Sequence, residues 1–238
     1  GDPQAPFGKL IEVLEHHGAI ADGRLAHDVV LVSIGDHFDY DAQDWYTAGQ
    51  DGLRFLRWLA SHCAVRPAGD AVAIAQDRIR EKAFVRSCGI EVAPYAVIEN
   101  VSDIDAADAK LFPGILKRAR FGYDGKGQAR VANAAEARKA FKDMGAESCV
   151  LEQRIALKCE ISAVVARGAD GVGRGFPVAE NRHRNGILDV SIVPARVAPQ
   201  QAQNAMDWAL TIAEKLDYCG VLAVEFFVTE SGALLVNE

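Results

Sequence analysis

Four stretches of the chain carry apolar residues at the spacing of three and four that marks one face of a helix. Their periodic positions are 10, 13, 14 and 17; 72, 75, 79 and 83; 137, 140, 141 and 144; and 202, 205, 206, 209, 210, 213 and 216. Each stretch predicts an amphipathic helix, and we expect the second to run as one segment until Gly89 ends it.

Short apolar runs between these helices predict strands. They are VVLVSIG (29–35), AVI (96–98), GILK (114–117), ARV (129–131), CVLEQRI (149–155), ISAVVARG, GFPVAEN, ILDVSIVPARV, VLAVEFFV and LLVNE. The Asn185-Gly186 pair indicates a hairpin turn. Runs of strands broken by few helices favour α+β layers over a doubly wound parallel sheet. We expect a partial α/β unit at 1–70, a first α+β unit at 71–148 and a second at 149–238.

Composition narrows the class of protein. The chain has 238 residues, half of them apolar, and a formal charge of −7, which argues against coating nucleic acid or an anionic membrane but allows a small anionic ligand. The opening GDPQAPFGKL lacks the regions of a secretory signal, and no apolar run nears a membrane span, so we expect no membrane and a cytoplasmic location. Five widely spaced cysteines without a C-x-x-C pair are read as reduced core residues.

The stretch FGYDGKGQ (121–128) is a candidate phosphate loop. Glycines let backbone N–H groups approach phosphate oxygens, and Lys126 adds a positive charge. Gly127 follows Lys126 where a Walker motif has Ser or Thr, and a strand rather than a helix comes next. A loop between two antiparallel strands could close over phosphates, and a solvated turn is the alternative. Lys117 is a second phosphate candidate, unless it merely reaches solvent from the strand end.

The last hairpin carries a candidate metal site. A two-residue turn at Ser231-Gly232 would place Glu225 opposite Glu238, with the two carboxylates about 5 Å apart. Such a pair needs protonation or a cation, and Mg²⁺ prefers oxygen ligands, to which Asn237 could add one. A four-residue turn would instead place Glu225 opposite Val236. Pairing of the carboxylates with basic side chains is the other alternative.

Two further segments carry polar candidates. Glu152 and Glu160 flank the turn between two predicted strands, where carboxylates could accept ribose hydroxyls or simply be surface charges. The loop ENRHRNG (180–186) contains His183 and Arg184, and arginine suits phosphate or carboxylate groups. A solvated hairpin tip is the alternative. The sequence has no G-x-S-x-G elbow, so covalent nucleophilic catalysis is poorly supported.

Taken together in order, these motifs resemble a known family. ILKRARFGYDGKGQARV, CVLEQRI with CEISAVVARG, FPVAENRHRNGILDVSIVPARV and GVLAVEFFVTESGALLVNE closely resemble the carboxyaminoimidazole ribonucleotide synthetases of purine biosynthesis, which belong to the ATP-grasp superfamily. The resemblance covers about residues 52–238. The family's glycine-rich N-terminal strand is not recognised in residues 1–51, which we interpret as a partial preATP-grasp-like unit, and we expect a large subdomain truncated at its C-terminus.

The resemblance implies an ATP-grasp fold, ATP and Mg²⁺ as cofactors, and a role for each matching residue. Lys126, Asp124 and Arg184 are the implied catalytic residues, and Glu225 and Glu238 the implied metal ligands. The implied nucleotide-binding residues are Arg78, Lys117, Gly122, Tyr123, Asp124, Gly125, Lys126, Gly127, Gln128, Glu152, Gln153, Arg154, Ile155, Glu160, His183, Asn237 and Glu238.

The implied reaction phosphorylates bicarbonate with ATP and transfers the carboxyl group of carboxyphosphate to the amine of 5-aminoimidazole ribonucleotide. The partners are therefore ATP, bicarbonate and this ribonucleotide, and a homodimer is possible. Two alternatives are a nucleotide-binding module without a complete substrate site, and a different ATP-grasp carboxylase or formate-using ligase, against which the pair GYDGKGQ and ENRHRNG argues.

Overall fold

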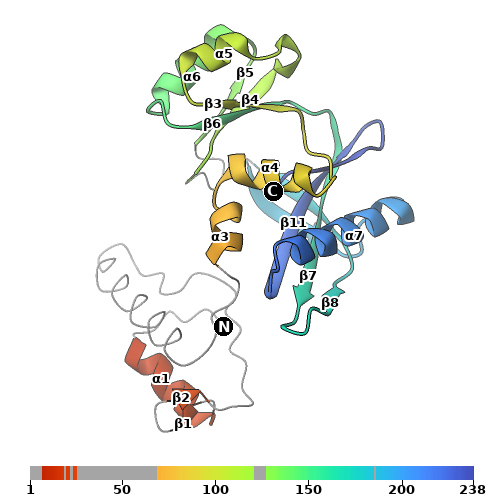
Figure 1. Ribbon diagram of the computed structural model, residues 1–238. Coiled ribbons are helices and arrows are strands. Elements are labelled where there is room, and N and C mark those ends of the chain that lie inside the picture. Colours follow the sequence, from red (N-terminus) through yellow and green to blue (C-terminus); the bar gives the residue numbers. More distant parts are fainter. Residues whose placement is uncertain (1–6, 19, 22–23, 26–68, 121–126, 185) are drawn as a thin grey trace. The chain divides into compact units, whose positions relative to one another are not determined.

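The structure is a computed structural model and describes residues 7–18, 20–21, 24–25, 69–120, 127–184 and 186–238 (Figure 1). The chain divides into two compact units, residues 1–66 and 67–238. The first contains helix α1 (Phe7–His16) and the antiparallel strands β1 (Ile20–Ala21) and β2 (Arg24–Leu25). Helix α1 confirms the first predicted helix. The strand predicted at 29–35 lies outside the described residues, and the preATP-grasp-like character of this unit stays a prediction.

The second unit begins with two helices, α3 (Gly69–Ala75) and α4 (Arg78–Ser87). Asp77 precedes α4 in an extended conformation, and its carboxylate accepts hydrogen bonds from the N–H groups of Ile79 and Arg80. The prediction of one continuous helix is therefore wrong, because an N-cap of this kind starts a new helix. The cap also fixes the position of Arg78, the first residue of α4.

A four-stranded antiparallel sheet follows, in the order β3-β6-β4-β5. Its strands are β3 (Tyr95–Ile98), β4 (Gly114–Arg118), β5 (Gln128–Val131) and β6 (Cys149–Gln153). Helices α5 (Val101–Ala106) and α6 (Ala134–Asp143) lie against it, with a 3₁₀ turn at Ala109–Leu111 (Figure 1). Phe141 of α6 is 2% exposed within this core and confirms the apolar face predicted for that helix.

Strand β6 belongs to this first sheet, whereas the sequence analysis began the second unit at residue 149. β6 lies between β3 and β4, and its first four residues are all buried. The order of strands in a sheet depends on contacts between segments that are distant in sequence, and the local hydrophobic pattern does not predict such contacts. The change from one sheet to the other therefore occurs after Gln153, between β6 and β7.

The second sheet has six strands in the order β10-β9-β7-β11-β12, with β8 paired to β7. They are β7 (Leu157–Arg167), β8 (Gly173–Gly175), β9 (Ala179–Arg184), β10 (Ile187–Ile192), β11 (Gly220–Thr229) and β12 (Leu234–Val236). Helix α7 (Pro199–Lys215) packs against β7 and β11 through Ala205, Ala209, Ile212 and Ala213 (Figure 1). Val85 of α4 joins the same core. Together the two sheets confirm the α+β prediction.

The hairpin of β9 and β10 has the connection that its sequence predicts. Arg184 pairs with Ile187, so residues 185 and 186 connect the strands, and Gly186 has φ +82°. No helix in the described part of the chain is both long and apolar enough to cross a membrane. The described cysteines form no disulfide, and Cys149 is fully buried.

Candidate functional site

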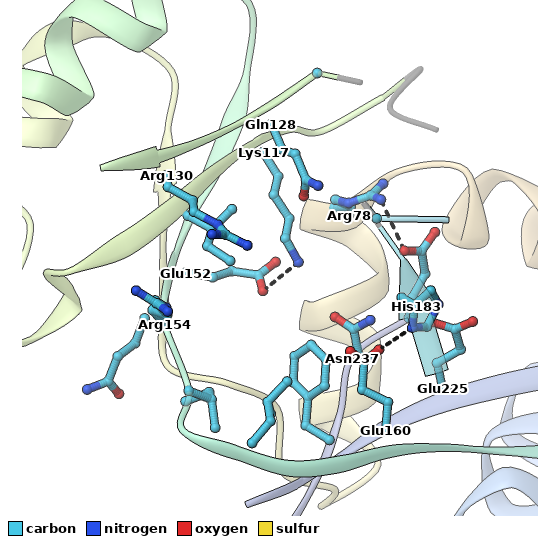
Figure 2. A pocket seen from close by; sticks show the side chains of 18 of the residues that line it. Arg78, Lys117, Gln128, Arg130, Glu152, Arg154, Glu160, His183, Glu225 and Asn237 are labelled. Atoms are coloured by element: carbon cyan, nitrogen blue, oxygen red, sulfur yellow. Dashed lines mark hydrogen bonds and ion pairs between the residues drawn. The ribbon is translucent and has the colours of Figure 1, made fainter. Parts of the chain in front are cut away.

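A cavity of about 1000 Å³ lies between the two sheets of the second unit. Residues from β4, β5 and β6 line one side, and residues from β7, β9, β11 and the end of the chain line the other. Figure 2 shows their side chains converging on one space. The predicted site residues in this lining are Arg78, Lys117, Gly127, Gln128, Glu152, Gln153, Arg154, Ile155, Glu160, His183, Glu225, Asn237 and Glu238.

The four-stranded sheet presents a group of two lysines and one carboxylate. Lys117 Nζ on β4 lies 3.0 Å from Glu152 Oε2 on β6 (Figure 2), and Lys82 Nζ on α4 lies 3.2 Å from Glu152 Oε1. Burial would raise the pKa of Glu152, but Lys117 and Lys82 hold this pKa below its usual value. Glu152 is therefore an ionised carboxylate that balances one of the two ammonium groups.

The start of α4 joins the two sides of the cavity. Arg78 Nη2 lies 3.0 Å from Glu238 Oε2 at the end of the chain. The Arg78 N–H donates to the carbonyl of Ala119, and Arg120 Nε lies 2.9 Å from Asp77 Oδ2. These contacts hold the first residue of α4 beside the segment that leads from β4 into the glycine-rich stretch.

The glycine-rich stretch connects two paired strands, as predicted. Lys117 of β4 pairs with Gln128 of β5, and the Arg118 N–H donates to the carbonyl of Gly127. Gly127 and Gln128 line the cavity. The other predicted residues of this stretch, Gly122, Tyr123, Asp124, Gly125 and Lys126, lie outside the described residues.

The register of the last hairpin differs by one residue from the prediction. Gly232, with φ +88°, closes a three-residue loop in which Thr229 pairs with Ala233 through the backbone. This is a common hairpin loop because glycine adopts the left-handed conformation without strain. The two-residue turn at Ser231-Gly232 is therefore wrong, and the alternative four-residue turn is not observed either.

The end of the hairpin nevertheless brings the two predicted metal ligands together. The Glu225 N–H donates to the carbonyl of Glu238 at 2.7 Å, and the Asn237 N–H donates to the carbonyl of Glu225 at 2.8 Å. Two consecutive residues thus share Glu225 as their partner, as in a β-bulge. The bulge offsets the one-residue shift, so Glu238 again lies beside Glu225.

The oxygen atoms around Glu225 suit a hard divalent cation. Burial, and then the nearby carboxylate of Glu238, raise the pKa of Glu225. The Oδ1 atom of Asn237 is buried and has no hydrogen-bond partner. Two carboxylates and an amide oxygen are the donors that Mg²⁺ prefers, so these residues fit the ion. Within the described segments, no group of three or more His, Cys, Asp and Glu residues is arranged to hold a metal.

The remaining predicted residues divide between the cavity and its surroundings. His183 Nδ1 on β9 lies 3.1 Å from Glu160 Oε2 on β7, and both side chains face the cavity (Figure 2). Arg184 does not line the cavity. Its Nη2 lies 3.2 Å from Asp189 Oδ2, and its side chain is 77% exposed. The position of Arg184 therefore gives no support to its predicted catalytic role.

Several lining residues were missed by the sequence analysis. Ile115 and Arg130 lie two residues from Lys117 and Gln128, and Phe227 lies two residues from Glu225. Alternate residues of a strand share a face, so this spacing could have found them. Lys82 follows Arg78 by four residues, which places both on one face of α4.

The fold, with two sheets and a cavity lined by paired charges between them, is typical of proteins that hold a nucleotide between two sheets. Comparisons with known proteins identify the family. The ATP-grasp domain model matches residues 83–238. The chain belongs to the ATP-grasp family.

Within that family, several of the similar proteins are carboxyaminoimidazole ribonucleotide synthetases. The chain is 39% identical over 240 residues to the N5-carboxyaminoimidazole ribonucleotide synthase of Bacillus subtilis, covering 98% of this chain and 60% of the relative. A Staphylococcus aureus N5-carboxyaminoimidazole synthetase complexed with ADP has a TM-score of 0.70 at 31% identity, covering 90% of this chain and 58% of that one. A second solved structure, an ADP complex of an N5-carboxyaminoimidazole ribonucleotide synthetase, has a TM-score of 0.69 at 38% identity. This match covers 78% of this chain and 49% of that one.

The comparisons correct one expectation and set one limit. The likeness to the B. subtilis enzyme covers 98% of the chain and so extends into the first 51 residues, where the sequence analysis recognised none. The chain spans about half to three fifths of the length of these relatives.

Proposed function

We propose that this chain acts in the ATP- and Mg²⁺-dependent carboxylation of 5-aminoimidazole ribonucleotide with bicarbonate, as an ATP-grasp carbon–nitrogen ligase. One observation carries the proposal: every described residue of the predicted nucleotide site, from both sheets, lines the same cavity. The names of the similar proteins support the choice of substrate.

The residues on the two sides of the cavity would have different tasks. Lys117 and Arg78 would bind phosphate oxygens, and Gln153 to Ile155 would line the nucleotide at the point where one sheet gives way to the other. Glu225, Glu238 and Asn237 would hold Mg²⁺, which when bound offsets the negative charge of the phosphates. Arg78 would then exchange its contact with Glu238 for a phosphate oxygen.

The proposed chemistry balances without any further reactant. A bicarbonate oxygen attacks the γ-phosphorus of ATP, ADP leaves, and carboxyphosphate forms. The amine of the ribonucleotide then attacks the carboxyl carbon, phosphate leaves, and the amine loses one proton. The positive side chains that line the cavity would stabilise the charge that develops on the transferring group. Asp124 and Lys126 remain proposed contributors from the glycine-rich stretch.

The test is ADP release from Mg-ATP and bicarbonate, measured with and without 5-aminoimidazole ribonucleotide. We expect the ribonucleotide to stimulate ADP release and the carboxylated product to accumulate in equal amount. ADP release that is the same with and without the ribonucleotide would refute the proposed substrate.

The alternative function is a nucleotide-binding module without a complete substrate site. Binding of Mg-ATP without any turnover in the same assay would support the module. In either case the expected location is the cytoplasm, and a homodimer stays a prediction that sedimentation can test.

A further inference from the structure

Lys82 is a buried lysine that the proposed function leaves without a task. Its relative exposure is 1%, and it heads the largest fully buried side chains in the described residues. A buried ammonium group is costly unless partners replace its water. Lys82 Nζ has three such neighbours: Glu152 Oε1 at 3.2 Å, the carbonyl of Asn237 at 3.3 Å and the ring of Tyr95 at 5.9 Å.

The contacts of Lys82 join α4 to both sheets. Glu152 lies on β6 of the four-stranded sheet, and Asn237 follows β12 of the six-stranded sheet. Lys82 therefore lies outside the cavity lining, at the place where α4 contacts both sheets. The Lys82 side chain is only 2% exposed, compared with 12% for Lys117, so Lys117 is the more accessible of the two ammonium groups.

The charges of this group explain why two lysines are needed. Glu152 carries one negative charge and Lys117 one positive charge. Burial lowers the pKa of Lys82, but the carboxylate of Glu152 opposes this shift and favours the charged ammonium group. Lys82 can balance Glu152 from behind, which leaves the group with one net positive charge on the side that lines the cavity. Without Lys82, the charge of Lys117 would be cancelled by Glu152, and its attraction for phosphate would fall.

We propose that Lys82 is a positioning residue for the nucleotide: it neutralises Glu152 so that Lys117 can offer its charge to a phosphate. This inference rests on the proposed function, because it assumes that Lys117 binds a phosphate of ATP. Lys82 itself does not line the cavity and is not expected to touch the nucleotide.

The test compares the affinity of the chain for ATP in three variants by titration calorimetry. Lys82→Met keeps an unbranched side chain that is one atom shorter and removes its charge, and we expect ATP to bind about tenfold more weakly or worse. The double variant Lys82→Met/Glu152→Gln also removes the carboxylate that would cancel Lys117. We expect it to bind ATP at least about threefold more tightly than Lys82→Met does, because Lys117 then has no uncompensated carboxylate beside it.

The control is Lys139→Met. Lys139 is 80% exposed on α6, pairs with Asp143 and lies outside the cavity lining, so its loss changes the net charge by the same amount without removing a group beside Lys117. We expect ATP affinity within about twofold of wild type for this control. A loss equal to that of Lys82→Met would show a general charge effect and overturn the inference.

The outcomes separate this inference from the proposed function. A wild-type chain that does not bind ATP would refute the proposed function. If Lys82→Met binds ATP as tightly as wild type, the role of Lys82 alone is refuted. The same holds if the double variant binds ATP no more tightly than Lys82→Met, because a packing role of Lys82 would not depend on Glu152. If Lys82→Met does not fold, the double variant is compared with Glu152→Gln alone: ATP binding tenfold or more below that of Glu152→Gln overturns the inference, because Lys82 would then act without Glu152.

Discussion

The two sides of the cavity differ in charge, and the difference follows the two sheets. The four-stranded side carries Lys117, Arg130 and Arg154, and its carboxylate Glu152 is held by lysines. The six-stranded side carries Glu160 and Glu225, close to Glu238 at the end of the chain. A polyphosphate with a bound cation needs both kinds of surface, so the comparison shows how two sheets can divide the binding of Mg-ATP between them.

The two sides also differ in how their charges are compensated. On the four-stranded side each buried charge has an opposite partner within the protein, as Glu152 does with Lys117 and Lys82. On the six-stranded side Glu238 contacts Arg78, but the like charges of Glu225 and Glu238 lie together, and burial and then the carboxylate of Glu238 raise the pKa of Glu225. The four-stranded side can therefore bind an anion without a further group, whereas the six-stranded side needs a cation to offset its like charges.

The largest expected effect comes from removing the charge that faces the cavity. Lys117→Ala should weaken ATP binding about 10- to 100-fold, because it removes a charge-assisted phosphate contact. Titration calorimetry with ATP checks this, with exposed Lys139→Ala as the matched control. If Lys117→Ala and wild type bind ATP with equal affinity, Lys117 on the four-stranded side does not bind the phosphates.

A smaller effect, on the affinity for Mg²⁺, is expected from changing Glu225 on the six-stranded side. Glu225→Gln should raise the Mg²⁺ concentration needed for half-maximal ATP binding by about tenfold, because the variant removes a charged oxygen ligand. In EDTA the same variant should bind ATP no more weakly than wild type, because it removes a negative charge near the phosphates.

Exposed Glu230, in the loop of the same hairpin, supplies the control Glu230→Gln. Its Mg²⁺ titration should follow that of wild type. If the Mg²⁺ titration of Glu225→Gln also superimposes on that of wild type, the proposal that Glu225 binds Mg²⁺ is wrong.

The sequence predicted the two sides unequally well. Lys117 lies at the end of a strand and precedes a glycine-rich stretch, and both signals are local, so its placement needed no strand register. The carboxylate pair depended on the hairpin, where the predicted turn was one residue too short. Glu238 reached Glu225 only through the bulge at Asn237, which local pattern does not report.

The missed features share a physical cause. Lys82 lies on a helix whose sequence, RIREKAFVRS, is mostly polar, so its burial depends on the sheets that pack around it. The position of β6 in the first sheet depends on pairing with β3 and β4, which are distant in sequence. Contacts of this kind arise from tertiary packing rather than from local periodicity.

A third prediction concerns Glu81, which lies between the two sides on α4. Burial, and then the negative charge of Glu238, raise the pKa of Glu81 to about 8. The folded chain then keeps this proton between pH 5 and 8, while the unfolded chain releases it above about pH 4.5. The contribution of Glu81 to stability is therefore present at low pH and is lost as the pH rises through 8.

Glu81→Gln cannot titrate and should lose this part of the pH dependence. Between pH 5 and 8 the free energy of unfolding should fall less for the variant than for wild type, by up to about 3 kcal/mol. Urea unfolding at each pH checks this, with the exposed Glu99→Gln as control. Parallel pH profiles for wild type and Glu81→Gln would contradict the raised pKa.

The smallest effect is expected for Arg184. Its side chain is exposed, pairs with Asp189 and lies outside the cavity lining. Arg184→Gln should therefore change ATP affinity by less than about twofold. A tenfold loss in the same titration would show that the nucleotide reaches beyond the two sides described.

The most direct test of the central claim is a calorimetric titration of the chain with ATP, first in Mg²⁺ and then in EDTA. The two-sided cavity predicts one saturable site per chain, with clearly tighter binding when Mg²⁺ is present. Absence of ATP binding in both buffers, or equal affinity with and without Mg²⁺, would contradict a site in which one sheet binds phosphate and the other binds the metal.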